Sequence, residues 1–221
     1  KSKLNQYSDH VILKTSIEPK SVIKIINNSF PGISLVGYGK SIEIFKQVGN
    51  PKDVVERFNL KKLSGSHGIG HTRMATESAI TTDGSHPYST GEDECLVHNG
   101  SLSNHNNLRR DLVKKGNLFK SENDTEVAAG YISRNLLNKK SLKETLTDGL
   151  NDLDGFYTFI TGTKNGFAIV RDEIACKPAV VAETKDYVAI ASEFQAMANL
   201  PKVNSAKIFE PEPGIVYSWG K

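Results

Sequence analysis

The sequence predicts an α+β protein whose antiparallel sheets are covered by helices. Segments with helical spacing of apolar residues cluster in the middle of the chain, and segments typical of strands lie on both sides of them. Several strand segments are joined by two-residue connections, which allow antiparallel pairing but no parallel crossover. The chain has 221 residues, 38% of them hydrophobic, which is enough to bury one sizeable core. We therefore expect one domain over residues 1–221.

The first half of the chain predicts mostly strands, with two helices among them. Pro19 and Pro51 mark helix starts because proline is tolerated in a first helical turn, and Asn50 can cap the second helix. Gly39-Lys40 predicts the turn of a hairpin. The predicted elements are, in order, a strand over 10–17, a helix over 19–30, hairpin strands over 33–39 and 41–49, a helix over 50–60, and strands over 67–76 and 94–100.

The second half predicts three consecutive helices and then short strands. Asn123 and Ser141 are residue types that cap helix starts, and Gly116 is typical of a helix end. Asn165-Gly166 predicts a tight hairpin between two strands. The predicted elements are helices over 103–116, 123–139 and 141–153, a hairpin over 156–172, and strands over 177–184 and 187–193.

Composition excludes some classes of protein. The net charge is +3 with both signs interspersed, so electrostatics alone predicts neither a nucleic-acid nor a membrane partner. The sequence has no apolar run of about 18 residues and no signal peptide, which favours a soluble, cytoplasmic protein. Cys95 and Cys176 lie in apolar stretches and predict reduced interior thiols rather than a disulfide. The chain begins at Lys1 without an initiator methionine, which favours a fragment or a processed product.

Asn99-Gly100 is an unusual corner. It follows an apolar strand, yet a polar helical segment rather than a partner strand comes next. A side-chain amide and a glycine N–H at a strand end are the two donors that an oxyanion hole needs. Glycine would allow the backbone to approach a ligand closely. The alternative interpretation is an ordinary β-turn.

Two charged residues extend this hypothesis. Arg73 offers a planar fork that can hold a carboxylate, although a lone arginine is more often part of a surface ion pair. Asp124 lies in the first turn of a predicted helix, where it can bind an ammonium group or simply complement the helix dipole. Together with Asn99 and Gly100, they predict a ligand that is an α-amino acid with a reactive acyl group in its side chain.

These blocks carry a family resemblance. The segments GIGHTRMAT, SHPY, LVHNGSLSNHNNLRRDL, NDTEV and ACKPAV occur in order between about Gly68 and Glu193. They resemble the class II glutamine amidotransferase domain of the N-terminal-nucleophile hydrolases. Their wording is most similar to separate amidotransferase subunits related to archaeal-type glutamate synthases and to methylamine–glutamate N-methyltransferases. Amidophosphoribosyltransferases and glucosamine-6-phosphate synthase domains are similar but more distant.

The resemblance implies a fold and an activity. The fold would be an αββα sandwich of two antiparallel sheets between helical layers, with EPGIVYSW as a closing strand. The domain would bind glutamine, hydrolyse its side-chain amide without a cofactor, and supply ammonia to partner synthase subunits. The implied residues are Arg73 with Ala75 and Thr76 for the α-carboxylate, Asp124 for the α-amino group, His86 in the pocket wall, and Asn99 with Gly100 as the oxyanion hole.

One departure leaves alternatives open. Family members use an amino-terminal cysteine as nucleophile, whereas residue 1 here is Lys1. Cys95 and Cys176 are predicted to be structural. The chain is therefore expected to be a fragment that lacks the nucleophile strand; the alternatives are a non-catalytic glutamine-binding or regulatory subunit, or an amidophosphoribosyltransferase-like domain.

The histidines invite a metal hypothesis, because five of the six fall close together in the sequence. His67 and His71 are four residues apart, but the intervening glycines argue against a shared helical face. We therefore expect no metal. The five are His67, His71, His86, His98 and His105.

Overall fold

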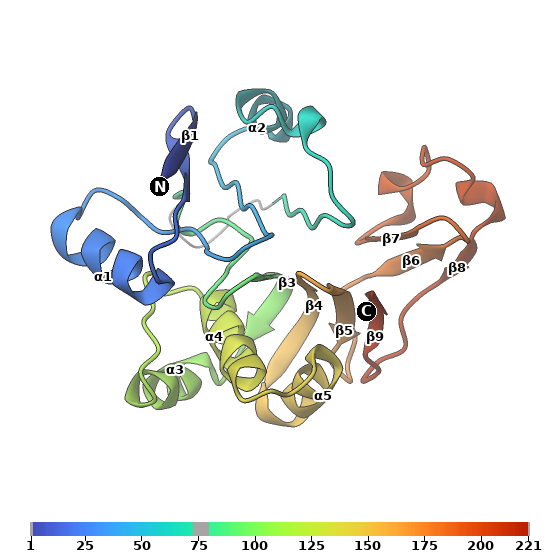
Figure 1. Cartoon of the computed structure of the whole chain (residues 1–221). Coiled ribbons are helices and arrows are strands. Elements are labelled where there is room, and N and C mark those ends of the chain that lie inside the picture. Colours follow the sequence, from blue (N-terminus) through green and yellow to red (C-terminus); the bar gives the residue numbers. More distant parts are fainter. Residues whose placement is uncertain (1, 73–79, 221) are drawn as a thin grey trace.

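A computed structural model of the chain describes residues 2–72 and 80–220, and Figure 1 shows its arrangement. Its centre is a four-stranded sheet in the order β3-β4-β5-β9. Every strand pair in it is antiparallel, as short hairpin connections require. The strands are β3 (Glu94–Leu102), β4 (Gly155–Thr163), β5 (Gly166–Arg171) and β9 (Tyr217–Gly220).

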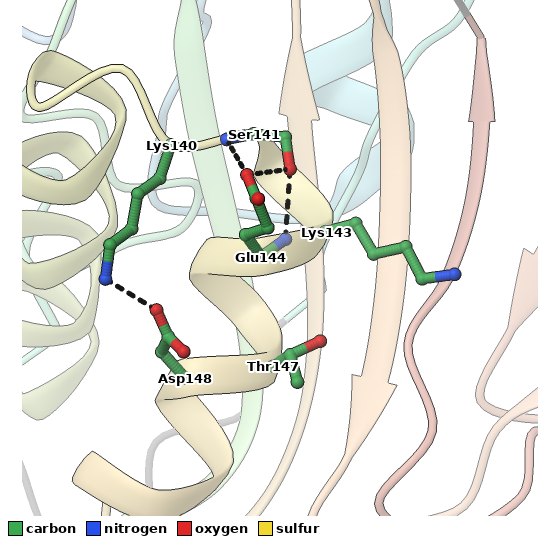
Figure 2. A pocket seen from close by; sticks show the side chains of 6 residues that line it. All are labelled: Lys140, Ser141, Lys143, Glu144, Thr147 and Asp148. Atoms are coloured by element: carbon green, nitrogen blue, oxygen red, sulfur yellow. Dashed lines mark hydrogen bonds and ion pairs between the residues drawn. The ribbon is translucent and has the colours of Figure 1, made fainter.

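Helices α4 (Asp124–Leu137) and α5 (Leu142–Asp152) cover one face of this sheet, and α3 (His105–Lys114) packs beside α4 (Figure 1). The two covering helices begin where the sequence predicts. The Asn123 side chain accepts from the Thr125 N–H, and Ser141 forms a capping box with Glu144 (Figure 2). The core between helices and sheet includes Leu96, Val127, Ala128, Ile132, Phe159 and Val170.

A smaller antiparallel sheet has the order β7-β6-β8 and lies beyond β9, on the side opposite α3 in Figure 1. Its strands are β6 (Val180–Glu183), β7 (Val188–Ala191) and β8 (Lys207–Phe209). A second apolar cluster formed by Ala182, Met197 and Val203 packs under it. The 3-10 helices η2 (Phe194–Ala196) and η3 (Val203–Ser205) follow β7.

The N-terminal part is a peripheral layer. It holds the β1–β2 hairpin (Lys3–Tyr7 and His10–Lys14), α1 (Pro19–Ser29), α2 (Pro51–Arg57) and the 3-10 helix η1 (Leu60–Lys62). All residues of α1 and α2 are at least partly exposed. The main apolar anchor is Phe58, which is fully buried and packs on Phe45 and His10.

The α+β class and the predicted helices are confirmed, whereas four predicted strands need correction. Residues 33–49 form no strand. Their backbone N–H groups at Lys40, Ser41 and Ile42 instead donate to one oxygen of Asp93 at 2.8, 2.8 and 3.1 Å. Burial alone would raise the pKa of Asp93, but these bonds hold it below its ordinary value. The side chain of a distant residue has replaced the hairpin ladder.

The other corrections concern the predicted strand over 67–76 and strand β3. Of the predicted strand over 67–76, residues 67–72 are irregular and residues 73–76 lie outside the described residues. Strand β3 continues to Leu102, so Asn99-Gly100 lies within a strand and not at its end. Strands β1 and β8 were not predicted. Within residues 2–72 and 80–220, no helix is long and apolar enough to cross a membrane.

Candidate functional site

A cavity of about 1330 Å³ opens beside β3. It takes in both the exposed edge of that strand and the sheet face turned away from α4 and α5. Val97 and Asn99 line it together with their cross-strand partners Ile160 and Thr158. The remaining walls come from residues 70–72, 122–125, 177–179, 190–193 and 195–196, from His86 and His105, and from His98, Gly100 and Ser101 of β3.

β3 is one of the two edge strands of the sheet that the described residues form, and two N–H groups of its outer edge have identified acceptors. Leu96 donates to the Tyr88 carbonyl at 2.8 Å, and Leu102 donates to Asp124 Oδ2 at 2.9 Å. The direction of the N–H group alternates from one residue to the next along a strand. Gly100 is an even number of residues from both Leu96 and Leu102, so its N–H points to the same edge. The edge at Gly100 therefore offers a donor to the cavity.

Gly100 cannot be replaced by a residue with a side chain without strain. Its φ is +141°, and an added Cβ would lie 2.0 Å from the Phe156 carbonyl oxygen. Glycine is required here by the close approach of the neighbouring strand β4, and the predicted close approach to a ligand stays a prediction.

Asp124 is the first residue of α4 and joins that helix to β3. Besides the bond to the Leu102 N–H, its Oδ1 lies 3.3 Å from Thr125 Oγ1 and 3.7 Å from His98 Nδ1. Its side chain is 19% exposed, so the carboxylate remains accessible from the cavity. An accessible carboxylate beside the donors of β3 suits a ligand that carries both an ammonium group and a carbonyl.

Three histidines lie close to Thr125 and to β3, and one of them, His98, also lies near the Asp124 carboxylate. His98 Nδ1 and His86 Nε2 lie 3.0 and 3.1 Å from Thr125 Oγ1, and His71 Nε2 lies 3.1 Å from the His98 carbonyl. The His71 and His86 rings stack at 4.1 Å. Burial lowers the pKa of His98 to about 4, against the opposing effect of Asp124, so its imidazole is neutral at pH 7.

The structure brings four predicted residues together, since His86, Asn99, Gly100 and Asp124 all line the cavity. Arg73, Ala75 and Thr76 lie outside the described residues. Sequence reasoning missed Thr125 and gave His98 no role except as a possible metal ligand. The available signal was a histidine on the helix-facing side of β3, where apolar residues are expected.

The cysteines differ from each other. Cys95 is buried as predicted, and burial raises the pKa of its thiol to about 11. Cys176 is exposed, so the prediction of an interior thiol was wrong there. It lies in the loop after β5, where Arg171 bonds the carbonyls of Ala175 and Lys177 and thereby shapes the chain.

Among the described residues, neither a metal-ion cluster nor a second hollow with unengaged carboxylates is found. In the described part of the chain, no three His, Cys, Asp or Glu side chains are grouped so that they could hold a metal ion. A second hollow of about 650 Å³ lies at the start of α5 (Figure 2). There Glu144 bonds Ser141 and Asp148 pairs with Lys140 at 2.6 Å, so both carboxylates are already engaged.

Comparisons with known proteins show the family of this chain. Residues 71–199 match a family described as a glutamine amidotransferase domain. The chain is 61% identical over 189 residues to the glutamine amidotransferase-like protein GlxB of Rhizobium meliloti (strain 1021), covering 86% of this chain and 63% of that protein. It is 31% identical over 212 residues to a putative glutamine amidotransferase of Methanothermobacter thermautotrophicus, covering 95% of this chain and 68% of that protein.

Two solved structures share the fold. Glutamine phosphoribosylpyrophosphate amidotransferase from B. subtilis superposes with a TM-score of 0.60 at 27% identity, over 76% of this chain and 38% of that one. An allosteric regulatory enzyme of purine biosynthesis superposes with a TM-score of 0.64 at 28% identity, over 76% and 36%. The chain thus spans less than two thirds of GlxB and of both solved chains. The family match includes β3, the start of α4 and the cavity between them, and on these grounds the chain belongs to the class II glutamine amidotransferase domain family.

Proposed function

We propose that this protein binds L-glutamine and hydrolyses its side-chain amide, so that ammonia passes to a partner synthase subunit. The observation that supports this most is that Asn99, Gly100 and Asp124 line one cavity in a member of this family. Glutamine carries an ammonium group at one end and an acyl carbon at the other, which matches a carboxylate beside a pair of hydrogen-bond donors.

In this proposal, the Asn99 amide and the Gly100 N–H bind the oxygen of the scissile carboxamide. That oxygen becomes negative when a nucleophile adds to the carbon, and donors fixed in advance stabilise the charge without reorganisation. Gly100 suits this role because its N–H points from an edge strand, where no further strand of the described sheet competes for it.

Asp124 would bind the α-ammonium group. One of its oxygens is already held by the Leu102 N–H, which fixes the carboxylate before a ligand arrives. The α-carboxylate is assigned by family resemblance to Arg73, with Ala75 and Thr76 beside it. His86 would close the wall behind Asp124, where it already bonds Thr125.

The nucleophile is assigned to neither cysteine of this sequence. Cys95 is buried with a raised pKa, and buried thiols of high pKa are inert. The chain spans 63% of the length of GlxB, so hydrolysis is proposed for the whole protein.

We also propose that residues 1–221 form one type-2 amidotransferase domain built as an αββα sandwich. The sheet face that carries Val97 and Asn99 lines the cavity, whereas α4 and α5 cover the opposite face. A second sheet packed across the cavity would enclose the glutamine between two sheets. Similarity to the separate amidotransferase subunits related to glutamate synthases supports a synthase as the partner that receives the ammonia.

Calorimetry with L-glutamine tests binding, with D-glutamine as control, and ammonia release by the full-length gene product tests hydrolysis. We expect saturable binding of the L-isomer and ammonia release that rises when the partner synthase is present. Binding without any ammonia release would favour the non-catalytic subunit. If neither isomer binds, the proposal is wrong.

A further inference from the structure

Three polar side chains converge on the hydroxyl of Thr125, the second residue of α4. His98 Nδ1, His86 Nε2 and Asp124 Oδ1 lie 3.0, 3.1 and 3.3 Å from its Oγ1. Thr125 is 1% exposed and His98 is 4% exposed. The Thr125 hydroxyl and the His98 imidazole are therefore closed to water, and both must find their hydrogen-bond partners among the neighbouring side chains.

The chemistry of the groups determines which of them donate hydrogen bonds and which accept them. A hydroxyl has one proton and two lone pairs, and a carboxylate only accepts. The proton of Thr125 therefore goes to Asp124, and both imidazoles must donate to the two lone pairs. It follows that His98 carries its proton on Nδ1 and that its Nε2 is a bare lone pair.

The surroundings of His98 Nε2 agree with this tautomer. The atom is buried and has no hydrogen-bond partner among the described residues, so a proton there would lack an acceptor. It lies only 2.9 Å from the position that a Cβ would take on Gly100. Burial also keeps the ring neutral, since it lowers the pKa of His98 to about 4.

We propose that Thr125 is a positioning residue for the ammonium site: its hydroxyl orients Asp124 and holds His98 as the Nδ1–H tautomer. This inference rests on the proposed function, in which Asp124 binds the ammonium group of glutamine. Without the hydroxyl, Asp124 Oδ1, at 3.7 Å, is an acceptor within reach of His98 Nδ1–H. The imidazole would then compete with the ligand for that oxygen.

The first experiment determines the tautomer of His98 by ¹⁵N NMR of the protein. We expect Nδ1 protonated and Nε2 unprotonated at pH 7, both in the wild type and in Thr125→Ser. Thr125→Val should lose this signature or shift the Nδ1 proton toward Asp124. A wild-type His98 protonated on Nε2 would overturn the proposal, whether or not glutamine binds.

The second experiment measures affinity for L-glutamine and for glutaric acid monoamide, which lacks the α-amino group. Thr125→Val should weaken glutamine binding roughly tenfold, the scale of one charge-assisted hydrogen bond, and leave monoamide binding within about twofold. Thr125→Ser should restore glutamine affinity. Thr145→Val is the matched control, because Thr145 is fully buried on α5 and its hydroxyl has no partner among the described residues.

Equal weakening for both ligands, or no rescue by serine, would show that Thr125 acts only through packing and would overturn the proposal. A wild-type protein that binds no glutamine would instead overturn the proposed function and the ligand part of this inference. The NMR result separates these cases, since the tautomer does not depend on a ligand.

Discussion

The Asp124 carboxylate accepts the backbone N–H of Leu102 at 2.9 Å and so joins the first turn of α4 to the outer edge of β3. This bond fixes a carboxylate two residues along the strand from Gly100. A helix start and a strand edge are thereby held at one cavity, and the fold itself sets the distance between the groups proposed to bind the ammonium and the carbonyl of the ligand.

Asp124→Asn should separate the structural from the electrostatic role of this side chain. The amide oxygen can still accept from the Leu102 N–H, but the amide NH₂ cannot accept the proton of the Thr125 hydroxyl. We therefore expect the free energy of unfolding to fall by about 1 kcal/mol, the scale of one hydrogen bond. Affinity for L-glutamine should fall by about tenfold or more, because the charge that attracts the ammonium group is lost. Calorimetry and urea unfolding measure the two effects.

Asp154→Asn is the control for this variant. Asp154 is exposed and accepts from the Ser103 hydroxyl at 2.7 Å. Its substitution by asparagine removes the same charge outside the cavity. If both variants weaken glutamine binding equally, Asp124 has no special role in the site.

Arg73→Lys tests the residue assigned to the α-carboxylate. Lysine keeps the charge but loses the planar fork, so glutamine should bind roughly tenfold more weakly. Arg110→Lys on the exposed surface of α3 serves as control. Unchanged affinity in a folded Arg73→Lys protein would remove Arg73 from the site.

Gly100→Ala should be strongly destabilising. The φ of +141° and the 2.0 Å approach of an added Cβ to the Phe156 carbonyl oxygen leave no room for a methyl group. We expect a loss of about 2 kcal/mol or more in the free energy of unfolding, from backbone strain and the displaced strand. Gly32→Ala is the control, since no atom lies within 4 Å of its added Cβ. Equal stability of the two variants would contradict the strand geometry.

Glu94 predicts a pH dependence of stability. Burial raises the pKa of this carboxyl from about 4.5 to about 8, so the folded protein binds a proton that the unfolded chain releases between these pH values. The contribution of this group to the free energy of unfolding is therefore fully present below pH 4.5 and is lost as the pH rises through 8. Glu94→Gln should remove this part of the pH slope, so the difference in unfolding free energy between variant and wild type should grow from pH 5 to pH 8. Parallel stability curves would show that Glu94 does not titrate in this way.

Local signals explain which parts of the fold could be predicted. Asn123 and Ser141 cap the helices that follow them, and Asn165-Gly166 turns the β4–β5 hairpin, because each signal acts within a few residues. The sequence of residues 33–49 alternates like a hairpin, but Asp93 accepts hydrogen bonds from three backbone N–H groups of this segment. Nothing in the local sequence indicates this long-range contact.

The residues of the candidate site also divide into those that the sequence could identify and those that it could not. Asn99, Gly100, His86 and Asp124 were identified from residue types and family resemblance, and they do line one cavity. The Asn-Gly corner was misread as a strand end because pairing with Thr158 and Tyr157 on β4 carries β3 through it. The joint role of Thr125 and His98 depends on α4 packing against β3, a contact that no short segment of sequence encodes.

Asn99→Ala tests the oxyanion hole in the full-length protein. The side chain lies on the cavity face of β3, and the negative oxygen exists only once a nucleophile has added to the amide carbon. The Michaelis constant for glutamine should therefore change little, whereas kcat should fall by roughly 10²–10³, the usual cost of one such donor. Steady-state ammonia release measures both constants, and Asn106→Ala on the exposed face of α3 controls for loss of an asparagine. A rise in the Michaelis constant with unchanged kcat would place Asn99 in ground-state binding instead, because only a donor that acts on the developing charge lowers the barrier without tightening the substrate complex.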